Sequence, residues 1–501
     1  MFYRPAIIPE GPSTTACKVI GSTSARAQYV PFVQRQTLDN YKKGLTVESS
    51  TQTPQTRQAV RNTILSAIVG TAVEWYDFYL YATAAATLFN KLFFPSFDHL
   101  VGTLLAFASF AIGFFVRPLG SVYFGRMGDR IGRKKVLIIT LLLMGGSTTL
   151  MGLLPTYAMV GIWAPILLTL LRALQGLGSG AEYAGAVLMV VEHAPPGRRG
   201  LYGAMPYMGV ALGLLMSLAT FNLSSHLSQD AFEEWGWRIP FLLSSVVVAL
   251  GLILRSTLEE SPIFEELKRR RATIKAPIRE VFRTSLRPIL CAWGARLGDN
   301  SLAYIYESFV IVYVTQQLHM ARSSIVTALM FSTAAQFITV PFFGWLSDQV
   351  GRKPVYIGGA VLSGLAIFPF FKLLQTQDLV WIYAGLFLVS SVAKTMMTSA
   401  QSPWLAEMFP SKVRYTGFSL AREVTSPISG GIAPMIAVGL LSIGDGSPHL
   451  VSIYVVVLAV ITAFSVFMGP ETRNRDLRDE TPEPSLDEPP VAAYPARSSH
   501  P

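Results

Sequence analysis

Charged side chains interrupt long apolar stretches of this sequence, at spacings that place several of them on one face of a helix. Glu74 and Asp77 are three residues apart, as are Arg172 and Gln175, and residues at this spacing are neighbours on a helix surface. Burial disfavours the charged form of a carboxylate, so such a group can take up a proton, whereas arginine binds a carboxylate through two parallel hydrogen bonds. The pattern indicates proton exchange and the binding of an organic anion within an apolar protein.

Two sets of residues carry these predicted roles. Proton exchange is expected at Asp77, Glu74 and Glu182. An anionic substrate is expected to contact Arg172, Gln175, Arg296, Asp299, Lys394 and Tyr81. A charge at the centre of a bilayer costs roughly 2.5–3.5 kcal/mol, so such residues usually face a cavity or an opposite charge. The alternative for each is a structural ion pair that fixes how two helices pack.

Motifs of covalent or metal-dependent catalysis do not occur in the sequence. The patterns Gly-x-Ser-x-Gly and His-Glu-x-x-His are missing, and Cys17 and Cys291 are the only cysteines, which leaves no disulfide framework or cysteine-based metal site. We therefore expect a protein that is not an enzyme, with no catalytic residue, no metal and no cofactor. A proton gradient is the expected driving force.

The elements that must position these charges are long apolar helices. With 51% hydrophobic and 14% charged residues and a mean hydropathy of +0.42, the chain has too few charges for a water-exposed surface, since soluble domains carry about 25%. Helices of about 20 apolar residues cross a bilayer. The sequence predicts an all-α integral membrane protein with twelve transmembrane helices in two six-helix bundles. The expected spans are 62–88, 101–124, 135–155, 160–190, 201–222, 238–257, 288–315, 324–346, 355–374, 379–403, 416–442 and 450–469.

Basic residues occur in every second loop between these spans. The loop after the second span holds five of them, and basic pairs recur at 198–199 and 352–353 and near 412–414. Because cytoplasmic loops collect Lys and Arg, both termini are expected in the cytosol. The net charge of +10 is then a signal of topology, and nucleic acid is not an expected partner. The expected partners are the lipid bilayer, protons and a small molecule; no obligate protein partner is evident.

The predicted domain organisation follows from the same pattern. Two polar tails flank two helical bundles, and a basic cytosolic linker joins the bundles. The tails lack the apolar run of a signal peptide and are expected to be disordered. The predicted boundaries are 1–57 for the N-terminal tail, 58–258 for the first bundle, 259–287 for the linker, 288–473 for the second bundle and 474–501 for the C-terminal tail.

An internal repeat relates the two bundles. Gly125-Arg-Met-Gly-Asp129-Arg-Ile-Gly132-Arg133-Lys134 returns as Gly344-Trp-Leu-Ser-Asp348-Gln-Val-Gly351-Arg352-Lys353, at an offset of 219 residues. Glu192-His-Ala-Pro195 returns as Glu407-Met-Phe-Pro410, and the last spans of the two bundles are followed by Glu259-Glu260-Ser-Pro262 and Pro470-Glu471-Thr-Arg473. Parallel halves of this kind suit alternating access to a site between them.

The repeated loops suggest a gate. Asp129 is expected to cap a helix N-terminus of the other bundle, where the helix dipole attracts a negative charge. Arg133 is expected to pair with Glu192, and Arg352 with Glu407. The alternative is that these charges only set the topology. The predicted gating residues are Gly125, Asp129, Arg130, Gly132, Arg133, Lys134, Glu192, Gly344, Asp348, Gly351, Arg352, Lys353, Glu407 and Arg414.

These motifs resemble the major facilitator superfamily, and further stretches resemble its metabolite:proton symporter branch. The resemblance rests on the repeated loop and on Glu74-Trp-Tyr-Asp77-Phe, Arg117-Pro-Leu-Gly120, Arg172-x-x-Gln175-Gly176, Gly236-Trp-Arg238 and Leu258-Glu-Glu-Ser-Pro262. It implies uptake of shikimate, 2-oxoglutarate, citrate or proline/betaine by symport across a bacterial cytoplasmic membrane, with the repeated loops as gates. Lys394 departs from the shikimate-type pattern, so the substrate is not determined.

Two other functions fit the same fold. An exporter or facilitator is one, although exporters usually carry a Gly-Pro motif in the fifth helix, where this chain has Pro206-Tyr-Met-Gly209. A non-transporting membrane sensor is the other, and it would bind substrate without accumulating it. Uptake driven by a proton gradient distinguishes all three.

Overall fold

The computed structural model describes residues 54–96, 99–225, 227–270 and 277–478, and the regular structure in these ranges is helical. Most of the predicted N-terminal tail lies outside them, as does the C-terminal tail beyond residue 478. The few described residues of these tails are ordered parts of the fold. Residues 54–57 begin the first helix, and Leu477 is 1% exposed.

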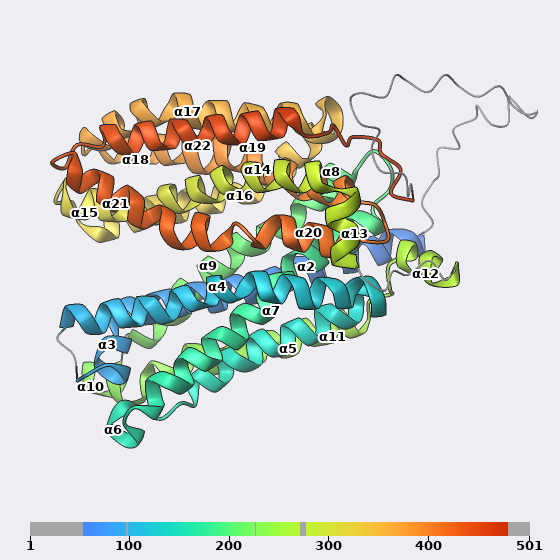
Figure 1. Cartoon of the computed structure of the whole chain (residues 1–501). Helices are drawn as coiled ribbons and strands as arrows, with labels where there is room; N and C mark the ends of the chain where they lie inside the picture. The colour runs from blue at the N-terminus through green and yellow to red at the C-terminus, as the bar shows by residue number, and fades with distance from the viewer. Residues whose placement is uncertain (1–53, 97–98, 226, 271–276, 479–501) are drawn as a thin grey trace, which may run out of the picture. The chain divides into compact units, whose positions relative to one another are not determined.

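The first half of the protein contains six long helical segments (Figure 1). Short helices α3, Phe89–Phe93, α6, Tyr157–Val160, and α10, Gln229–Ala231, lie in its connections, and the π-helix η2, Phe232–Gly236, precedes the last segment. The six segments are α2, Pro54–Thr87; α4, His99–Ile131; α5, Arg133–Gly152; α7, Trp163–His193; the run of α8, Arg199–Ala204, η1, Met205–Tyr207, and α9, Met208–Ser225; and α11, Arg238–Ser256.

The second half repeats this plan with six more segments, three of which contain a π-helical stretch. Two short helices in the predicted linker, α12, Pro262–Arg269, and α13, Pro277–Thr284, precede it. The segments are α14, Leu286–Tyr304, with η3, Ile305–Phe309, and α15, Val310–Gln316; α16, Arg322–Val350; α17, Arg352–Gln375; α18, Leu379–Leu386, with η4, Phe387–Lys394, and α19, Thr395–Met408; α20, Arg414–Glu423, with η5, Pro427–Ile432, and α21, Ala433–Ile443; and α22, His449–Met468.

Each of the twelve predicted spans coincides with one of these segments. Within the described ranges, eight helices meet both the length and the hydropathy needed to cross a membrane. The segments α2, α4, α7 and α14 fall outside that set, and each carries buried charged residues in mid-helix: Glu74, Arg117, Arg172 and Arg296. The two-bundle, twelve-helix prediction is confirmed.

The distribution of side chains is that of a protein surrounded by lipid. Large aliphatic residues are exposed on the outside, for example Ile338 at 76% and Leu365 at 70%, whereas Asp77 and Arg172 are each 1% exposed. An apolar exterior around a partly polar interior satisfies the charged groups inside the bundle and leaves the apolar ones to the hydrocarbon.

Glycines allow α4 and α7 to approach closely. A Cβ atom on Gly120 would lie 2.0 Å from the carbonyl oxygen of Leu177, and one on Gly176 would lie 2.3 Å from the carbonyl oxygen of Gly113. Small residues permit this backbone contact in membrane helices. The glycines of α7 therefore serve helix packing.

The two halves meet through a few helices. α20 packs against α4, and α8 packs against α16 and α19. Figure 1 shows α13 beside α20, and these two helices are also in contact. The repeated loop motifs lie at the ends of α4 and α16, so the contacts between the halves bring them opposite the helix N-termini of the other half.

Candidate functional site

The two repeated loops have the same backbone conformation, and each loop is bound by a glutamate that follows the last long helix of its half. Gly132 has φ 109° and ψ 158°, and Gly351 has φ 110° and ψ 160°, a region open essentially to glycine alone. Glu260 accepts a hydrogen bond from the backbone N–H of Arg133 at 2.9 Å, and Glu471 accepts one from Arg352 at 3.0 Å. The internal sequence repeat therefore corresponds to a repeated backbone conformation and a repeated hydrogen bond.

The lysines of the loops extend this symmetry. Lys134 Nζ donates to the carbonyl oxygens of Ser256 and Leu258 at 2.7 and 2.6 Å. Lys353 Nζ donates to those of Phe467 and Gly469, both at 2.8 Å. Each lysine thus binds the C-terminal end of the last helix of its own half, where the helix dipole favours a cation.

The loop aspartates join the two halves. Asp129 accepts hydrogen bonds from the backbone N–H groups of Tyr415 at 3.1 Å and Thr416 at 2.9 Å, at the start of α20. Asp348 accepts them from Gly200 at 2.7 Å and Leu201 at 2.9 Å, at the start of α8. Each aspartate caps a helix of the opposite half, so the contact expected for Asp129 is present and has a counterpart at Asp348.

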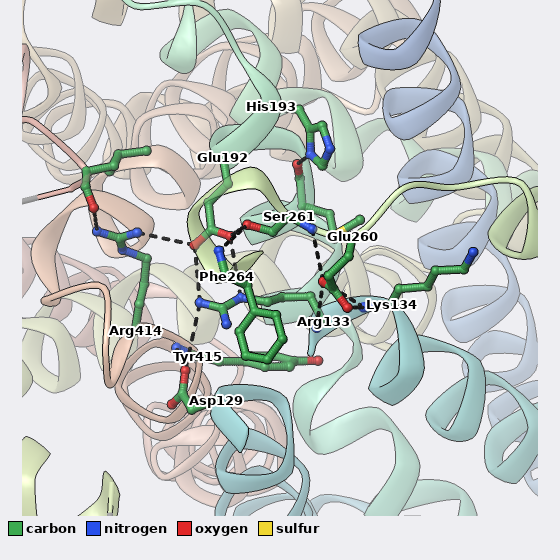
Figure 2. Close-up of polar contacts among 12 residues, drawn as sticks. Asp129, Arg133, Lys134, Glu192, His193, Glu260, Ser261, Phe264, Arg414 and Tyr415 are labelled. Atoms are coloured by element: carbon green, nitrogen blue, oxygen red, sulfur yellow. Dashed lines mark hydrogen bonds and ion pairs between the residues drawn. The ribbon is translucent and has the colours of Figure 1, made fainter. Parts of the chain in front are cut away.

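Glu192 lies between two arginines, one from each half (Figure 2). Arg133 Nη2 donates to it at 3.4 Å, Arg414 Nη1 donates to it at 3.2 Å, and the Ser261 hydroxyl donates to its other oxygen. All three charged side chains are at most 2% exposed. The expected Arg133–Glu192 pair is present, and Arg414 extends it across the two halves.

The matching cluster of the second half is built around Arg352. Its Nε and Nη2 donate to the two oxygens of Glu407 at 3.1 and 2.9 Å, and its Nη1 donates to Asp348 at 2.8 Å. Thr472 donates to Glu407 at 2.7 Å, in the place that Ser261 takes beside Glu192. The expected Arg352–Glu407 pair is present.

The remaining predicted gating residues lie around these two clusters. A Cβ atom on Gly125 would lie 3.1 Å from Cα of Thr416, and one on Gly344 would lie 2.9 Å from the carbonyl oxygen of Gly200. Both glycines therefore stand where the halves touch. Arg130, in contrast, is exposed at the end of α4. We use the name motif cluster for the seven buried charged residues of the two clusters described above: Asp129, Arg133, Glu192, Asp348, Arg352, Glu407 and Arg414.

A cavity inside the first half gathers four of the predicted site residues. Its volume is about 10 Å³, and its lining includes Glu74, Asp77, Arg172 and Gln175 together with Arg117. Arg117 Nη2 lies 3.3 Å from Glu74 Oε1, and the Ser244 hydroxyl donates to Asp77 at 2.8 Å. The other oxygen of Asp77 is buried and has no hydrogen-bond partner among the residues that the structure describes.

Arg172 is held by aromatic rings as well as by polar groups. Its guanidinium carbon lies 4.5 Å from the ring centre of Tyr81, 4.7 Å from that of Phe110 and 4.8 Å from that of Phe78. It also donates to Gln175, which in turn donates to Thr148 at 2.7 Å. Cation–π contacts strengthen when they are desolvated, so Tyr81 contributes to the placement of this arginine.

A second cavity lies where the two halves face each other, and we name it the interhalf cavity. Its volume is about 20 Å³, and residues of both halves line it: Tyr79 and Tyr207 from the first, and Arg296, Asp299, Glu307 and Arg422 from the second. Arg296 Nη1 lies 3.2 Å from Asp299 Oδ2, and Gln401 donates to the same oxygen at 2.7 Å. Lys394 pairs with Glu307 at the wall of this cavity.

Both cavities are about the size of a water molecule, which needs roughly 10–15 Å³. The structure thus represents a closed arrangement in which neither cavity has room for an organic acid. An organic acid would need a conformation in which the interhalf cavity is wider.

Glu182 lies apart from the other predicted proton-exchange residues. It forms an ion pair with Arg255 of α11 and accepts a hydrogen bond from Thr140 of α5 at 2.6 Å. Glu182 is completely buried and lines neither cavity. Its geometry is that of the structural ion pair that was the alternative for this residue.

Sequence reasoning missed three charged residues of the site, Arg117, Arg422 and Glu423. Arg117 bridges the halves, since it lies 3.3 Å from Glu74 and 3.6 Å from Glu423 of α20. Arg422 lines the interhalf cavity, and its guanidinium carbon lies 3.7 Å from the centre of the Tyr183 ring. The signal was present, because Arg422 and Glu423 interrupt the apolar run 416–442.

Comparisons with known proteins agree with this architecture. Residues 63–273 match the family profile described as "Sugar (and other) transporter", and residues 300–498 match that of the "Major Facilitator Superfamily". The Shikimate transporter of Escherichia coli K12 is 38% identical over 81% of this chain and 94% of its own length. The Inner membrane metabolite transport protein YhjE of the same organism is 38% identical over 83% of this chain and 96% of its own length.

A solved structure has the same fold. The proton:xylose symporter XylE bound to 6-bromo-6-deoxy-D-glucose superposes with a TM-score of 0.69, over 84% of this chain and 98% of that one. The two sequences are 16% identical, so the similarity concerns the arrangement of the helices.

Proposed function

Because this chain belongs to the major facilitator superfamily of multi-pass membrane transporters, we propose that it takes up a small organic acid together with protons, by alternating access. The inner-membrane relative supports the cytoplasmic membrane of a bacterium as its location. The loops rich in Lys and Arg support a cytosolic position for both termini and for the motif cluster.

The observation that carries this proposal is the set of buried cations around the interhalf cavity. Arg296 is 6% exposed, Arg422 3% and Lys394 1%, and each lies next to a carboxylate of the protein. Buried cations of this kind mark substrate pathways in membrane proteins, and arginine suits a carboxylate ligand. The relative named as a shikimate transporter supports an acid as the substrate.

Asp77 and Glu74 are the proposed proton sites of the first half. Both line the first-half cavity, and within the described ranges each has at least one buried oxygen without a hydrogen-bond donor. Such an oxygen is costly as a bare anion. Protonation removes this cost, so a proton taken up outside and released inside couples the gradient to the movement of the two halves. Arg172, held beside them by three rings, is a further proposed anion contact.

The motif cluster is the proposed cytosolic gate. Its contacts between the halves, Asp129 with α20, Asp348 with α8, and Glu192 with Arg414, exist only while this end is closed. Opening towards the cytosol must break all of them, and closing towards it restores them. The gate therefore stabilises the state that faces away from the cytosol.

Uptake into proteoliposomes tests the proposed function. The panel is shikimate, 2-oxoglutarate, citrate, benzoate and betaine, each offered with and without an inward proton gradient. Gradient-driven accumulation of one acid is the expected result. Exchange without accumulation would instead favour a facilitator or exporter, binding without transport a sensor, and accumulation of betaine alone a zwitterion carrier.

The proton role of Asp77 has its own test. Asp77→Asn keeps the hydrogen bond from Ser244 possible but cannot exchange a proton, so it should retain substrate exchange and sustain less accumulation per unit of pH gradient than the wild type. If the accumulation per unit of pH gradient equals that of the wild type, Asp77 is not a proton site.

A further inference from the structure

One ion pair of the interhalf cavity is held by both halves of the protein. Lys394 at the end of η4 pairs with Glu307 on η3. From the first half, the Tyr79 hydroxyl donates to Glu307 at 3.4 Å, and Lys394 Nζ lies 5.6 Å from the ring centre of Tyr207. Both partners thus stand on π-helical turns, which occur frequently at functional sites.

The buried charges around the cavity are balanced. Three cations of the second half each have a carboxylate neighbour in the same half: Arg296 has Asp299 at 3.2 Å, Arg422 has Glu423 at 3.0 Å, and Lys394 has Glu307. An added anion would leave a net negative charge in a low-dielectric site, which is strongly unfavourable. Binding an anion here therefore requires that one of these carboxylates becomes neutral.

Glu307 is the carboxylate best placed to do so. Its side chain is 19% exposed, whereas Asp299 is 0% and Glu423 2% exposed. Asp299 is also held by Gln401, and Glu423 by Ser426 and by Arg117 at 3.6 Å. Glu307 has only Lys394 and Tyr79 among the hydrogen-bond and ion-pair partners in the described part of the chain.

We propose that Glu307 is a proton-coupling carboxylate, and that the substrate carboxylate replaces it as the counter-ion of Lys394. This inference rests on the proposed function and adds a proton site in the second half to those of the first. The groups that face Glu307 are Lys394 from η4, Tyr79 from α2 and Tyr207 from η1, with Tyr304 on the preceding turn and Arg296, Asp299 and Arg422 across the cavity. α15 and α21, which also pack against η3, carry no charged residue.

The exchange involves one proton and no other bond. A proton from the outside binds a carboxylate oxygen of Glu307, which leaves Lys394 as an unpaired ammonium group. The substrate carboxylate then accepts hydrogen bonds from Lys394 Nζ, so that the charge in the cavity is the same as before. On the cytosolic side the substrate leaves, Glu307 releases its proton, and the Lys394–Glu307 pair forms again.

Glu307→Gln tests this step, because glutamine resembles the protonated acid and cannot release a proton. In proteoliposomes with shikimate, and with any other panel acid that the wild type accumulates, each cycle of the variant should carry one proton fewer. The accumulation sustained per unit of pH gradient should fall about tenfold, since one proton contributes a factor of ten per pH unit. One positive charge fewer should also cross the membrane with each substrate molecule. This charge is obtained from the membrane potential at which a given substrate gradient produces no net flux.

Two variants complete the test. Glu307→Asp keeps a titratable carboxylate and should keep the wild-type coupling ratio, even where its rate is lower. Lys394→Gln should lose binding of the acid, and the double variant Glu307→Gln with Lys394→Gln, which is balanced in charge, should fold and still fail to bind it. Wild-type coupling in Glu307→Gln, or acid binding by the double variant, would overturn the proposal.

Calorimetry covers the case in which Glu307→Gln is not recovered in membranes. The number of protons taken up when the detergent-solubilised protein binds substrate is measured in buffers of different ionisation enthalpy. The wild type should take up a proton on binding, and Glu307→Asp should take up the same number of protons, with the uptake centred at a different pH. Binding without proton uptake would contradict the exchange. If the wild type accumulates no acid at all, the proposed function fails and this inference fails with it; if the wild type accumulates an acid but its coupling is independent of Glu307, only the inference fails.

Discussion

Asp129 and Thr416, which are 287 residues apart in the chain, share two hydrogen bonds across the two halves of the protein. Asp129 Oδ2 accepts from the backbone N–H of Thr416 at 2.9 Å and from its hydroxyl at 2.7 Å. A carboxylate at a helix N-terminus is stabilised by the free N–H groups and by the helix dipole. This cap exists only while the two halves are together at this end.

Asp129→Ala should therefore open the motif cluster. Loss of an N-cap costs about 1–2 kcal/mol, which corresponds to a shift of about 5- to 30-fold in a two-state equilibrium. Distances between spin labels on either side of the motif cluster measure the shift. The population with the longer distance should increase.

A cap that lies within one half provides the matched control. Asp378 accepts from the backbone N–H of Val380 at 2.9 Å, at the start of α18. Asp378→Ala should cost a comparable amount of helix stability without changing the distance across the motif cluster. Equal distance distributions in Asp129→Ala and Asp378→Ala would show that Asp129 has no gating role.

The Glu192–Arg414 contact should contribute to the same closed state. Arg414→Gln removes a hydrogen bond between charged groups, worth about 1.5–3 kcal/mol, and the bonds of Arg414 to the carbonyl oxygens of Phe409 and Leu477. Arg133 and Ser261 still satisfy Glu192. The variant should fold, open at the motif cluster and transport with an altered balance between uptake and release. Cysteine accessibility at this end of α20 measures the opening.

Arg133→Gln serves as the comparison, because Arg133 binds Glu192 within the first half. It should lower the unfolding temperature more than it changes cysteine accessibility. If both arginine variants open the cluster equally, the contact between the halves has no special role in closure.

Gly132→Ala should destabilise the protein. Alanine at φ 109° costs about 1–3 kcal/mol, and its Cβ atom would lie 2.1 Å from Glu260 Oε2. The displaced Glu260 would then lose its hydrogen bond with the N–H of Arg133. A lower midpoint of thermal unfolding in detergent is the expected result.

Gly197→Ala separates the two causes. Gly197 also has a positive φ, 79°, but a Cβ atom there would meet no described atom within 4 Å apart from those of its chain neighbours. The variant Gly197→Ala should therefore be destabilised by backbone strain alone, and its midpoint of thermal unfolding should fall by less than that of Gly132→Ala. The idea that Glu260 braces the loop fails if the two variants unfold at the same temperature.

The Glu182–Arg255 pair should prove to be structural. Arg255→Gln leaves a buried, unpaired carboxylate, and breaking such a pair typically costs about 3–5 kcal/mol. The double variant Glu182→Gln with Arg255→Gln should recover most of the lost stability, as judged by thermal unfolding. Glu182→Gln alone should keep the accumulation per unit of pH gradient. A loss of coupling in a variant that folds normally would restore the proton-exchange role predicted from the sequence.

The partners of these charges show how far sequence reasoning reached. The expected pairs Arg133–Glu192 and Arg352–Glu407 are both present. They could be predicted because each pair joins two positions that the internal repeat marks. Arg414, although it was among the predicted gating residues, was not expected to bind Glu192. Lys394 was an expected substrate contact, but nothing in the spacing of the two residues linked it to Glu307 across 87 positions.

The sequence by itself determined the twelve helices, their grouping into two related halves and the positions at which charges enter the membrane. These features depend on local properties, namely the length of an apolar run, the periodicity of a helix and the alternation of basic loops. Only the tertiary structure decided which charges neutralise one another: Glu182 with Arg255, Arg117 between Glu74 and Glu423, and Lys394 with Glu307. The rotation and register of each packed helix select these pairs, and close contacts such as that between Gly120 and Leu177 set that register.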